Sequence, residues 1–300
     1  MLKRLLSKVV TLGLNPPLIA VKKIVQASLE EDLLPMGDLT ASLIDPSVET
    51  TASFVSRQEG ILAGTLCMME TIVQIDPTLD LNLIIVDGQK LEKGSCIAHL
   101  QGRLSSILIA ERTALNFLCH LSGIASLTHL FVQQAFQVNP NVGIRDTRKT
   151  LPGLRALEKA AIRAGGGYNH RGNLSDSVLL KDNHLGGITI PQAFSMAKKM
   201  WPGRTIEVEC DSLDQVRQAV EIGVDFILLD NMNVEQVKNA VEIVRNFTDS
   251  NKVKLEVSGG ISFDSIQDYA ATGVDYLAIG SLTHSAPSLD IGLDLQSQIN

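Results

Sequence analysis

The chain has 300 residues and a formal net charge of −7. Its length suits one or two domains, and a hydrophobic content of 45% is ample for a buried core. Net acidity and an aromatic content of only 4% argue against a module that binds nucleic acid through charge and base stacking.

The N-terminus and the cysteines favour a cytoplasmic protein. Positive charges precede apolar residues at the start of the chain, as in a signal peptide, but Lys8 interrupts the apolar run and Pro16 and Pro17 break it. We interpret these residues as a lead-in or an amphipathic first helix. No apolar run approaches the roughly 18 residues that span a bilayer. The four cysteines show no CxxC spacing, which favours reduced thiols over a disulfide scaffold or a zinc site.

The first half of the chain predicts a small α+β domain. Glycines and the hairpin-type turn Asp87-Gly88 separate short β-rich runs, and a helix is expected on either side of them. The tail at residues 289–295 alternates after Pro287, and we expect it to return to this domain as a strand. The predicted strands are 52–58, 81–86 and 95–100, and the predicted helices are 17–31 and 108–136.

The second half repeats one pattern, in which a short β-branched run is followed by an amphipathic helical stretch. In residues 213–221, for example, Ser212 or Asp211 can cap the helix and Gly223 ends it. Strands that alternate with helices of this length predict βαβ units and a parallel sheet. The predicted strands are 142–147, 177–183, 205–211, 224–231, 252–260 and 274–281, and the predicted helices are 154–164, 191–200, 213–221, 234–245 and 263–271.

The carboxyl ends of these strands favour an α/β barrel over an open sheet. Functional groups that follow many strands form a ring in a barrel, whereas an open doubly wound sheet gathers them at one switch point. The residues at these ends are Arg148, Lys149, Lys181, Glu209, Asp230, Ser258 and Gly280. Six strands are too few for the standard eight-stranded barrel. We divide the chain into an α+β domain at 1–116, with 286–300 returning to it, and a barrel domain at 117–285.

A basic island lies inside this acidic chain. Residues 141–184 carry eight Lys and Arg against four acids, a net charge of +4, whereas the rest of the chain carries −11. Such a contrast indicates a pocket for a small, highly charged anion rather than a general affinity for polyanions. Guanidinium and ammonium groups are the side chains suited to carboxylates and phosphates.

The residues of this island and an ordered series of further motifs resemble the quinolinate phosphoribosyltransferases. The resemblance runs from about residue 37 to about residue 295. The matching motifs are Glu111-Arg112-Thr113-Ala114-Leu115-Asn116, Leu121-Ser122-Gly123-Ile124-Ala125, Asp146-Thr147-Arg148-Lys149-Thr150, Pro152-Gly153-Leu154-Arg155, Asn169-His170-Arg171, Lys181-Asp182-Asn183-His184, Glu207-Val208-Glu209, Leu229-Asp230-Asn231, Ser258-Gly259-Gly260 and Ile279-Gly280-Ser281.

The resemblance implies an incomplete, six-stranded barrel of the type II phosphoribosyltransferase kind, beside a smaller α+β sandwich. It also implies that phosphoribosyl pyrophosphate and quinolinate give nicotinate mononucleotide, pyrophosphate and carbon dioxide. The implied catalytic residues are Lys149, Lys181, Glu209 and Asp230. The implied substrate-binding residues further include Arg112, Thr147, Arg148, His170, Arg171, Ser258, Gly259, Gly260, Ile279, Gly280 and Ser281, and His284 is an additional candidate.

Each group of these residues has an expected task. The cations would hold the pyridine dicarboxylate and the phosphoribosyl group, and the strand-end carboxylates Glu209 and Asp230 would stabilise positive charge on the ribose and bind Mg²⁺, directly or indirectly. The glycine turns after the last two strands would take the 5′-phosphate. In the family Arg112 reaches the partner subunit's site, which implies at least a homodimer. The expected partners are therefore two small-molecule substrates and a second copy, with no nucleic acid and no membrane.

Three other functions stay open from the residues alone. A related phosphoribosyltransferase would use nicotinate, an aldolase would use Lys181 as a Schiff base, and a non-catalytic relative would only bind phosphorylated ligands. Several polar residues also have plainer interpretations. We expect Arg155, Lys159 and Arg163 to form a solvated helix face, with Glu158 paired to one of them. For Glu207 the plainer interpretation is a salt bridge to a barrel lysine.

Overall fold

The computed structural model describes residues 14–181, 186–247 and 253–296. The chain forms two compact units. Unit 1 contains residues 1–129, 150–166 and 282–300, and unit 2 contains residues 130–149 and 167–281. The sequence placed the boundary at 116/117, inside the long helix α4 (Leu104–Phe136), whereas the two units divide near the end of that helix. The motif residues Asp182, Asn183 and His184 lie outside the described residues, as does most of the expected N-terminal helix.

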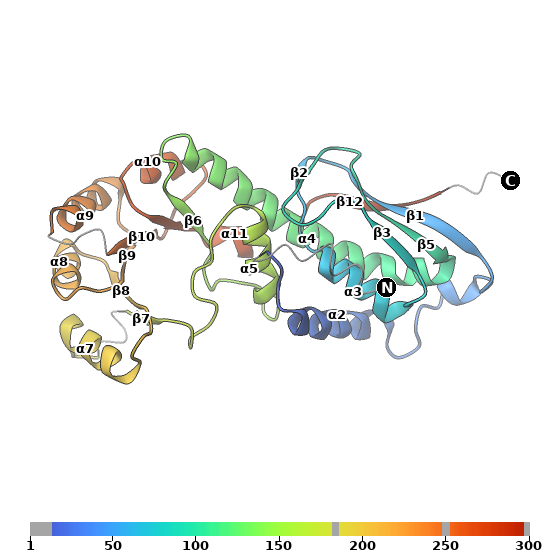
Figure 1. Cartoon of the computed structure of the whole chain (residues 1–300), viewed down its shortest axis with the longest axis horizontal. Coiled ribbons are helices and arrows are strands. Elements are labelled where there is room, and N and C mark those ends of the chain that lie inside the picture. The colour runs from blue at the N-terminus through green and yellow to red at the C-terminus, as the bar shows by residue number, and fades with distance from the viewer. Residues whose placement is uncertain (1–13, 182–185, 248–252, 297–300) are drawn as a thin grey trace. The chain divides into compact units, whose positions relative to one another are not determined.

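Unit 1 is built on a four-stranded antiparallel sheet in the order β12-β1-β5-β3 (Figure 1). The tail forms the edge strand β12, and Leu293 lies opposite Phe54 of β1, which is the return that the alternating tail predicted. A separate two-stranded sheet pairs β2 with β4. The strands are β1 (Glu49–Ser56), β2 (Gly60–Ile61), β3 (Asp80–Leu83), β4 (Lys90–Leu91), β5 (Cys96–Arg103) and β12 (Ile291–Leu295).

Helix α3 of unit 1 was missed by the sequence interpretation. Its residues from Thr65 to Ile72 are all buried, so it has no polar face and no helical alternation of apolar and polar positions. Asp87 accepts hydrogen bonds from the backbone N–H groups of Gly64 (3.1 Å) and Thr65 (3.0 Å) at the start of this helix. The helical segments of unit 1 are α2 (Leu18–Leu33), η1 (Ala41–Leu43), α3 (Thr65–Ile75), most of α4, α5 (Arg155–Ala164) and most of α11 (Ser281–His284).

Helix α4 is the one helix among the described residues that has the length and apolar composition to cross a membrane. Its most apolar window has a mean hydropathy of 1.4, and 56% of that window is buried within the protein. Polar residues such as Asn116 and Ser122 interrupt it, which is why the sequence shows no uninterrupted apolar run of that length. The core helix of a folded domain has the same properties, so the feature is weak evidence for a membrane span.

Helix α5 of unit 1 is not the solvated face that its spaced cations predicted. Lys159 is only 6% exposed, and the guanidinium of Arg163 donates to the carbonyl oxygens of Leu14 (3.3 Å) and Asn15 (3.2 Å). Glu158 is fully buried and pairs with His120 Nε2 at 3.1 Å rather than with a cation of its own helix. Lys159 and Arg163, which lie four residues apart on α5, therefore make contacts inside the protein rather than forming a solvated face.

Unit 2 is a six-stranded parallel sheet with helices that follow its strands (Figure 1), as predicted. Three of the helices begin with a capping box, at Thr189/Gln192, Ser212/Gln215 and Asn233/Gln236. The strands are β6 (Gly143–Arg145), β7 (Val178–Leu180), β8 (Ile206–Cys210), β9 (Phe226–Asp230), β10 (Lys254–Ser258) and β11 (Tyr276–Ala278). The helices are α7 (Ile190–Met200), α8 (Leu213–Glu221), α9 (Val234–Asn246) and α10 (Ile266–Ala270).

The strand order of unit 2 makes it an incomplete barrel. The order is β6-β11-β10-β9-β8-β7, so the first strand of the unit bonds to the last strand while the others follow in sequence. A sheet wound in one direction can bring its first and last strands together only by curling, whereas a doubly wound sheet reverses its order at a switch point. No described residues pair β6 with β7, and this break is where the barrel stays open.

We expect Gly123→Ala in α4 to destabilise the protein, although alanine normally stabilises a helix interior by about 1 kcal/mol. The tail crosses this helix so closely that a Cβ at Gly123 would lie 2.0 Å from the carbonyl oxygen of Pro287. Leu289 N–H also donates to Cys119 O of the same helix (2.9 Å), which holds the tail in place. Overpacking of this kind costs about 1–3 kcal/mol.

Urea unfolding of the wild type and Gly123→Ala would measure this loss, with Asn116→Ala at an exposed position of α4 as the control. Equal or greater stability of Gly123→Ala would show that the tail does not approach the helix in this way.

Candidate active site

A cavity of about 490 Å³ opens at the carboxyl ends of the strands of unit 2. Carboxyl ends of barrel strands are the usual position of active sites in α/β barrels. The cavity is lined by Thr147, Arg148, Lys149, His170, Arg171, Leu179, Lys181, Glu209, Leu228, Asp230, Asn231, Glu256, Ser258, Gly259 and Ala278. Ten of these residues were candidates from the sequence. They lie in β8, β9 and β10, directly after β6, β7 and β10, or in the segment that precedes β7.

Six candidates lie outside this lining: Arg112, Gly260, Ile279, Gly280, Ser281 and His284. The backbone N–H of Ile279 already donates to the carbonyl oxygen of Arg145 (2.9 Å), so it has no free donor for a phosphate. His284 is exposed and its Nδ1 contacts the hydroxyl of Ser285 at 2.6 Å. Arg112 is an exposed residue of α4 in unit 1.

Part of the cavity lining is cationic. Arg148 and Arg171 are both half-buried, and the Nε of each is a buried donor without a hydrogen-bond partner among the described residues. Arg171 Nη1 donates to the carbonyl oxygen of Ser177 (3.1 Å), which fixes its direction. Burial and the neighbouring Arg148 lower the pKa of Arg171. Two guanidinium groups that repel each other and retain unused donors form a site prepared for an anion.

A buried carboxylate holds the segment that carries His170 and Arg171. Asp146 is fully buried, and it accepts from the side-chain amide of Asn169 (2.7 Å) and from the backbone N–H of His170 (2.8 Å). Tyr168 extends this attachment, because its N–H donates to Ile144 O (2.7 Å) and its carbonyl accepts from Asp146 N–H (3.2 Å). The segment therefore lies along β6 like a short extra strand, with Tyr168 beside Arg145.

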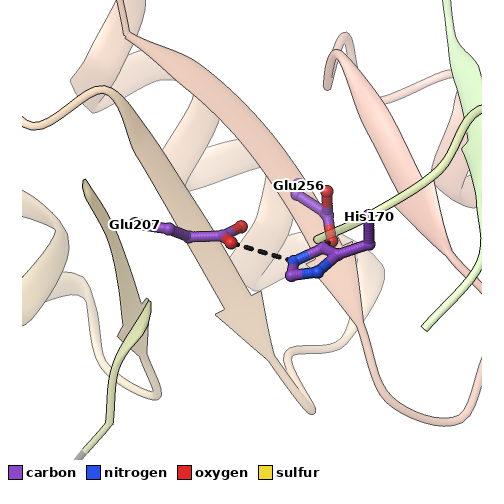
Figure 2. A group of neighbouring side chains, drawn as sticks. All are labelled: His170, Glu207 and Glu256. Atoms are coloured by element: carbon purple, nitrogen blue, oxygen red, sulfur yellow. Dashed lines mark hydrogen bonds and ion pairs between the residues drawn. The ribbon is translucent and has the colours of Figure 1, made fainter. Parts of the chain in front are cut away.

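The ring of His170 points toward Glu207, and Glu256 lies close to the same ring (Figure 2); both carboxylates are buried. Its Nε2 is 2.9 Å from Glu207 Oε2 on β8 and 3.4 Å from Glu256 Oε1 on β10. Glu256 also forms an ion pair with Arg145, whose guanidinium lies 4.5 Å from the ring centroid of Tyr276. The expected partner of Glu207 was a barrel lysine. That expectation is wrong, because the partner is His170.

Burial and the neighbouring Glu207 raise the pKa of Glu256 from its ordinary value near 4.5 to about 7. The ligand atoms of His170, Glu207 and Glu256 lie within 4.8 Å of one another, a spacing that a metal ion could bridge. Arg145 already places a cation on Glu256, so one of the two carboxylates has a protein partner of opposite charge.

The strands β8 and β9 bring carboxylates to the lining of the cavity. Glu209 at the end of β8 forms an ion pair with Lys181, which directly follows β7. Asp230 is the last residue of β9 and accepts a hydrogen bond from the side-chain amide of the adjacent Asn231 (2.7 Å). The cavity is thus lined by cations that follow β6 and β7 or precede β7 and by carboxylates of β8 and β9, and the Lys181–Glu209 pair joins the two groups.

The sequence interpretation missed five lining residues: Leu179, Leu228, Asn231, Glu256 and Ala278. Glu256 could have been found, because it precedes Ser258 by two residues and side chains two apart on a strand face the same side. Glu207 and Glu209 show the same spacing on β8. The apolar residues carry no comparable signal, because Leu and Ala in a buried strand are ordinary core residues.

We expect Glu256→Gln to change how stability depends on pH. A raised pKa means that the folded protein binds this proton more tightly than the unfolded chain, so the contribution of Glu256 to stability falls as the pH rises from about 4.5 to about 7. Glutamine does not titrate, so the variant should gain about 1–3 kcal/mol relative to the wild type between pH 5 and 7.5.

Urea unfolding at both pH values would measure this gain, and the exposed Glu221→Gln serves as the control because its carboxylate lies at the surface. Parallel pH profiles for the wild type and Glu256→Gln would contradict the raised pKa.

Comparisons with known proteins agree with this geometry. Two family models match the chain, "Quinolinate phosphoribosyl transferase, N-terminal domain" over residues 38–122 and "Quinolinate phosphoribosyl transferase, C-terminal domain" over residues 124–294. The nicotinate-nucleotide pyrophosphorylase (carboxylating) of Mycobacterium leprae is 41% identical over 281 residues, which cover 92% of this chain and 97% of that protein. The probable enzyme of the same name in Bacillus subtilis is 39% identical and covers 92% and 93%.

A solved structure has the same fold. The nicotinate-nucleotide pyrophosphorylase from Francisella tularensis superposes with a TM-score of 0.88 at 40% identity, covering 94% of this chain and 98% of that one. The fold, the ordered motifs and the two matched family models cover nearly the whole chain. This chain therefore belongs to the quinolinate phosphoribosyl transferase family.

Proposed function

We propose that this chain transfers the phosphoribosyl group of phosphoribosyl pyrophosphate to quinolinate, releasing pyrophosphate and carbon dioxide and forming nicotinate mononucleotide for NAD biosynthesis. The observation that carries the proposal is that one cavity is lined both by fixed cations, which follow β6 and β7 or precede β7, and by carboxylates of the neighbouring strands β8 and β9. A dicarboxylate and a pyrophosphate need several fixed cations to replace water, whereas a sugar that develops positive charge needs carboxylates.

The cations of the cavity lining are suited to quinolinate. Arg148 and Arg171 present unused guanidinium donors, and His170 is held at the cavity floor by Glu207. A planar guanidinium binds a carboxylate through two parallel hydrogen bonds, so two arginines match two carboxylates on one ring. Nicotinate has only one carboxylate and would leave one arginine unpaired, which favours the dicarboxylate as the acceptor. Lys149, an exposed residue of the same cavity lining, would contact quinolinate or the phosphoribosyl group.

The carboxylates of β8 and β9 are suited to the ribose. The ring nitrogen of quinolinate attacks C1 of the ribose, and the bond from C1 to the pyrophosphate oxygen breaks with its electrons leaving on pyrophosphate. Glu209 and Asp230 would stabilise the positive charge that develops on the sugar. The ribosylated ring is a cation, so it accepts the electrons of the breaking C2–carboxylate bond, and a proton from water then replaces the carbon dioxide at C2. The protein supplies positioning and charge for this step, with no covalent nucleophile.

Mg²⁺ fits the same carboxylates. Magnesium prefers one or two carboxylates together with substrate phosphates, and Glu209 and Asp230 lie at the ends of neighbouring strands and line one cavity with room for phosphates. The ion would neutralise charge on the leaving pyrophosphate. Loss of turnover with a chelator and its recovery with Mg²⁺ would support the requirement, and full turnover without any divalent cation would refute it.

We further propose that the protein is a cytoplasmic homodimer in which Arg112 completes the site of the partner. Arg112 is an exposed residue of α4 that lies outside the lining of the cavity in its own chain, which is consistent with this role. Light scattering that found a fully active monomer would contradict the dimer, and cell fractionation would test the location.

We expect nicotinate mononucleotide to form from quinolinate, phosphoribosyl pyrophosphate and Mg²⁺, with one carbon dioxide per product, and no product to form from nicotinate. Mass spectrometry of the two parallel reactions would measure this. Product from nicotinate alone would keep the phosphoribosyl site and overturn the role given to the arginines. No product from either acceptor would overturn the proposed reaction.

We expect Arg148→Lys and Arg171→Lys to raise KM for quinolinate about 10- to 100-fold, because lysine keeps the charge and loses the paired donors. KM for phosphoribosyl pyrophosphate should stay within about threefold, since the ribose would lie against Glu209 and Asp230. Steady-state kinetics would measure both constants. Arg204→Lys, at an exposed position of unit 2 outside the cavity, is the matched control, and equal effects in all three variants would refute the assignment.

A further inference from the structure

Asn231 combines a strained backbone with a place in the cavity wall. Its φ of 53° makes it the one non-glycine residue with positive φ among the described residues. The left-handed region is costly for residues other than glycine, and such strain is retained where the surrounding structure fixes it, often at functional sites. Asn231 directly follows Asp230 and lines the cavity.

The contacts of Asn231 join two strand ends. Its backbone N–H donates to the carbonyl oxygen of Ser258 at the end of β10 (2.9 Å). Its side-chain amide donates to Asp230 Oδ2 at the end of β9 (2.7 Å). The residue thus holds the carboxylate of one strand and the backbone of the next strand at the same time.

The close approach extends to Gly259. A Cβ on Gly259 would lie 2.2 Å from Asn231 Oδ1 and 3.0 Å from the backbone nitrogen of Asn231. Gly259 also has a φ of +97°. At the next residue, Gly260, the φ is +65° and a Cβ would meet no atom within 4 Å. The space at Gly259 is therefore filled by Asn231, and the glycine is required by this side chain as well as by its own backbone.

Packing and helix capping do not account for Asn231. The residue is exposed, so it adds nothing to the core, and the cap of α9 is Asn233, which accepts from Gln236 N–H (2.9 Å). A glycine at position 231 would adopt the same φ without strain. What glycine would lack is the hydrogen bond to Asp230 and the contact with Gly259.

We propose that Asn231 is a positioning residue for the phosphoribosyl donor. It fixes the carboxylate of Asp230 against the Ser258–Gly259 turn. The distance between Asp230, which would bind the ribose, and this turn, which would bind the 5′-phosphate, therefore stays constant. The inference rests on the proposed function, because it takes Asp230 and this turn as the donor side of the cavity. It assigns a role to a residue that touches Asp230 rather than the reacting atoms.

Two variants test the role in catalysis. Asn231→Asp keeps the shape but replaces the donor by a second carboxylate beside Asp230, and Asn231→Gly relieves the backbone strain and removes the side chain. In both, kcat/KM for phosphoribosyl pyrophosphate should fall about 10- to 100-fold, while KM for quinolinate stays within about threefold. If Asn231 were merely structural, kcat/KM for phosphoribosyl pyrophosphate and KM for quinolinate would both change or would both stay the same. Either of these results would overturn the proposal.

Asn233→Asp is the matched control. It adds the same negative charge two residues away, outside the cavity, and aspartate caps a helix as well as asparagine does. Its kinetics should equal those of the wild type, and a loss as large as that of Asn231→Asp would mean that general charge, not the contact with Asp230, causes the effect.

A double-mutant cycle tests the contact with Gly259 without any turnover. Gly259→Ala should lower the melting temperature in the wild type and lower it less in the Asn231→Gly background, where Oδ1 is absent. Additive losses would overturn the contact. If the wild-type protein made no nicotinate mononucleotide, the proposed function would fail, whereas this cycle would still decide whether Asn231 and Gly259 are coupled.

Discussion

Two carboxylates buried inside the sheet of unit 2 determine how the rest of the site is built. Glu256 is fully buried and Glu207 is 4% exposed, and an unpaired charge in such a position would cost several kcal/mol. Arg145 and His170 lie next to them and offset that cost. Because Glu207 fixes His170, the next residue, Arg171, enters the cavity from a defined position. The position of this cation in the cavity lining therefore depends on the buried contacts of Glu207 and Glu256.

The cations and the carboxylates of the cavity come from different parts of the sheet. The cations that face the cavity follow β6, follow β7 or lie in the segment before β7, whereas Glu209 is the penultimate residue of β8 and Asp230 ends β9. Lys181 and Glu209 pair where these two groups meet, so neither excess of charge extends across the whole cavity. One cavity thus offers cations for a dicarboxylate and carboxylates for a sugar that becomes positive.

Much of this arrangement could be predicted from the sequence, because period and capping are local signals. The helix at 213–221 was predicted with its observed bounds, since Ser212, the apolar stripe and Gly223 mark it. The charged residues of the cavity could be proposed because they follow or end β-rich runs that are visible in the sequence. Helix α3 was missed because its buried residues show no polar face, and the partner of Glu207 was predicted wrongly because pairing across strands leaves no mark in the sequence. Asn231 belongs to a motif that the sequence did indicate, but it was not a candidate site residue, because its contacts depend on a φ value and on the neighbouring strand.

The open side of the barrel, at the free edge of β6, contributes to the site. An edge strand presents unpaired backbone groups that must be covered, and β6 is covered on its open side by residues near Tyr168, which bond to Ile144 and Asp146 as a parallel strand would. A full strand there would continue along β6 and close the barrel. The short segment instead ends at once, held by Asp146, and turns His170 into the interior and Arg171 toward the cavity. The six-stranded sheet thus gains its anion-binding loop from the place where a closed barrel would have had another strand.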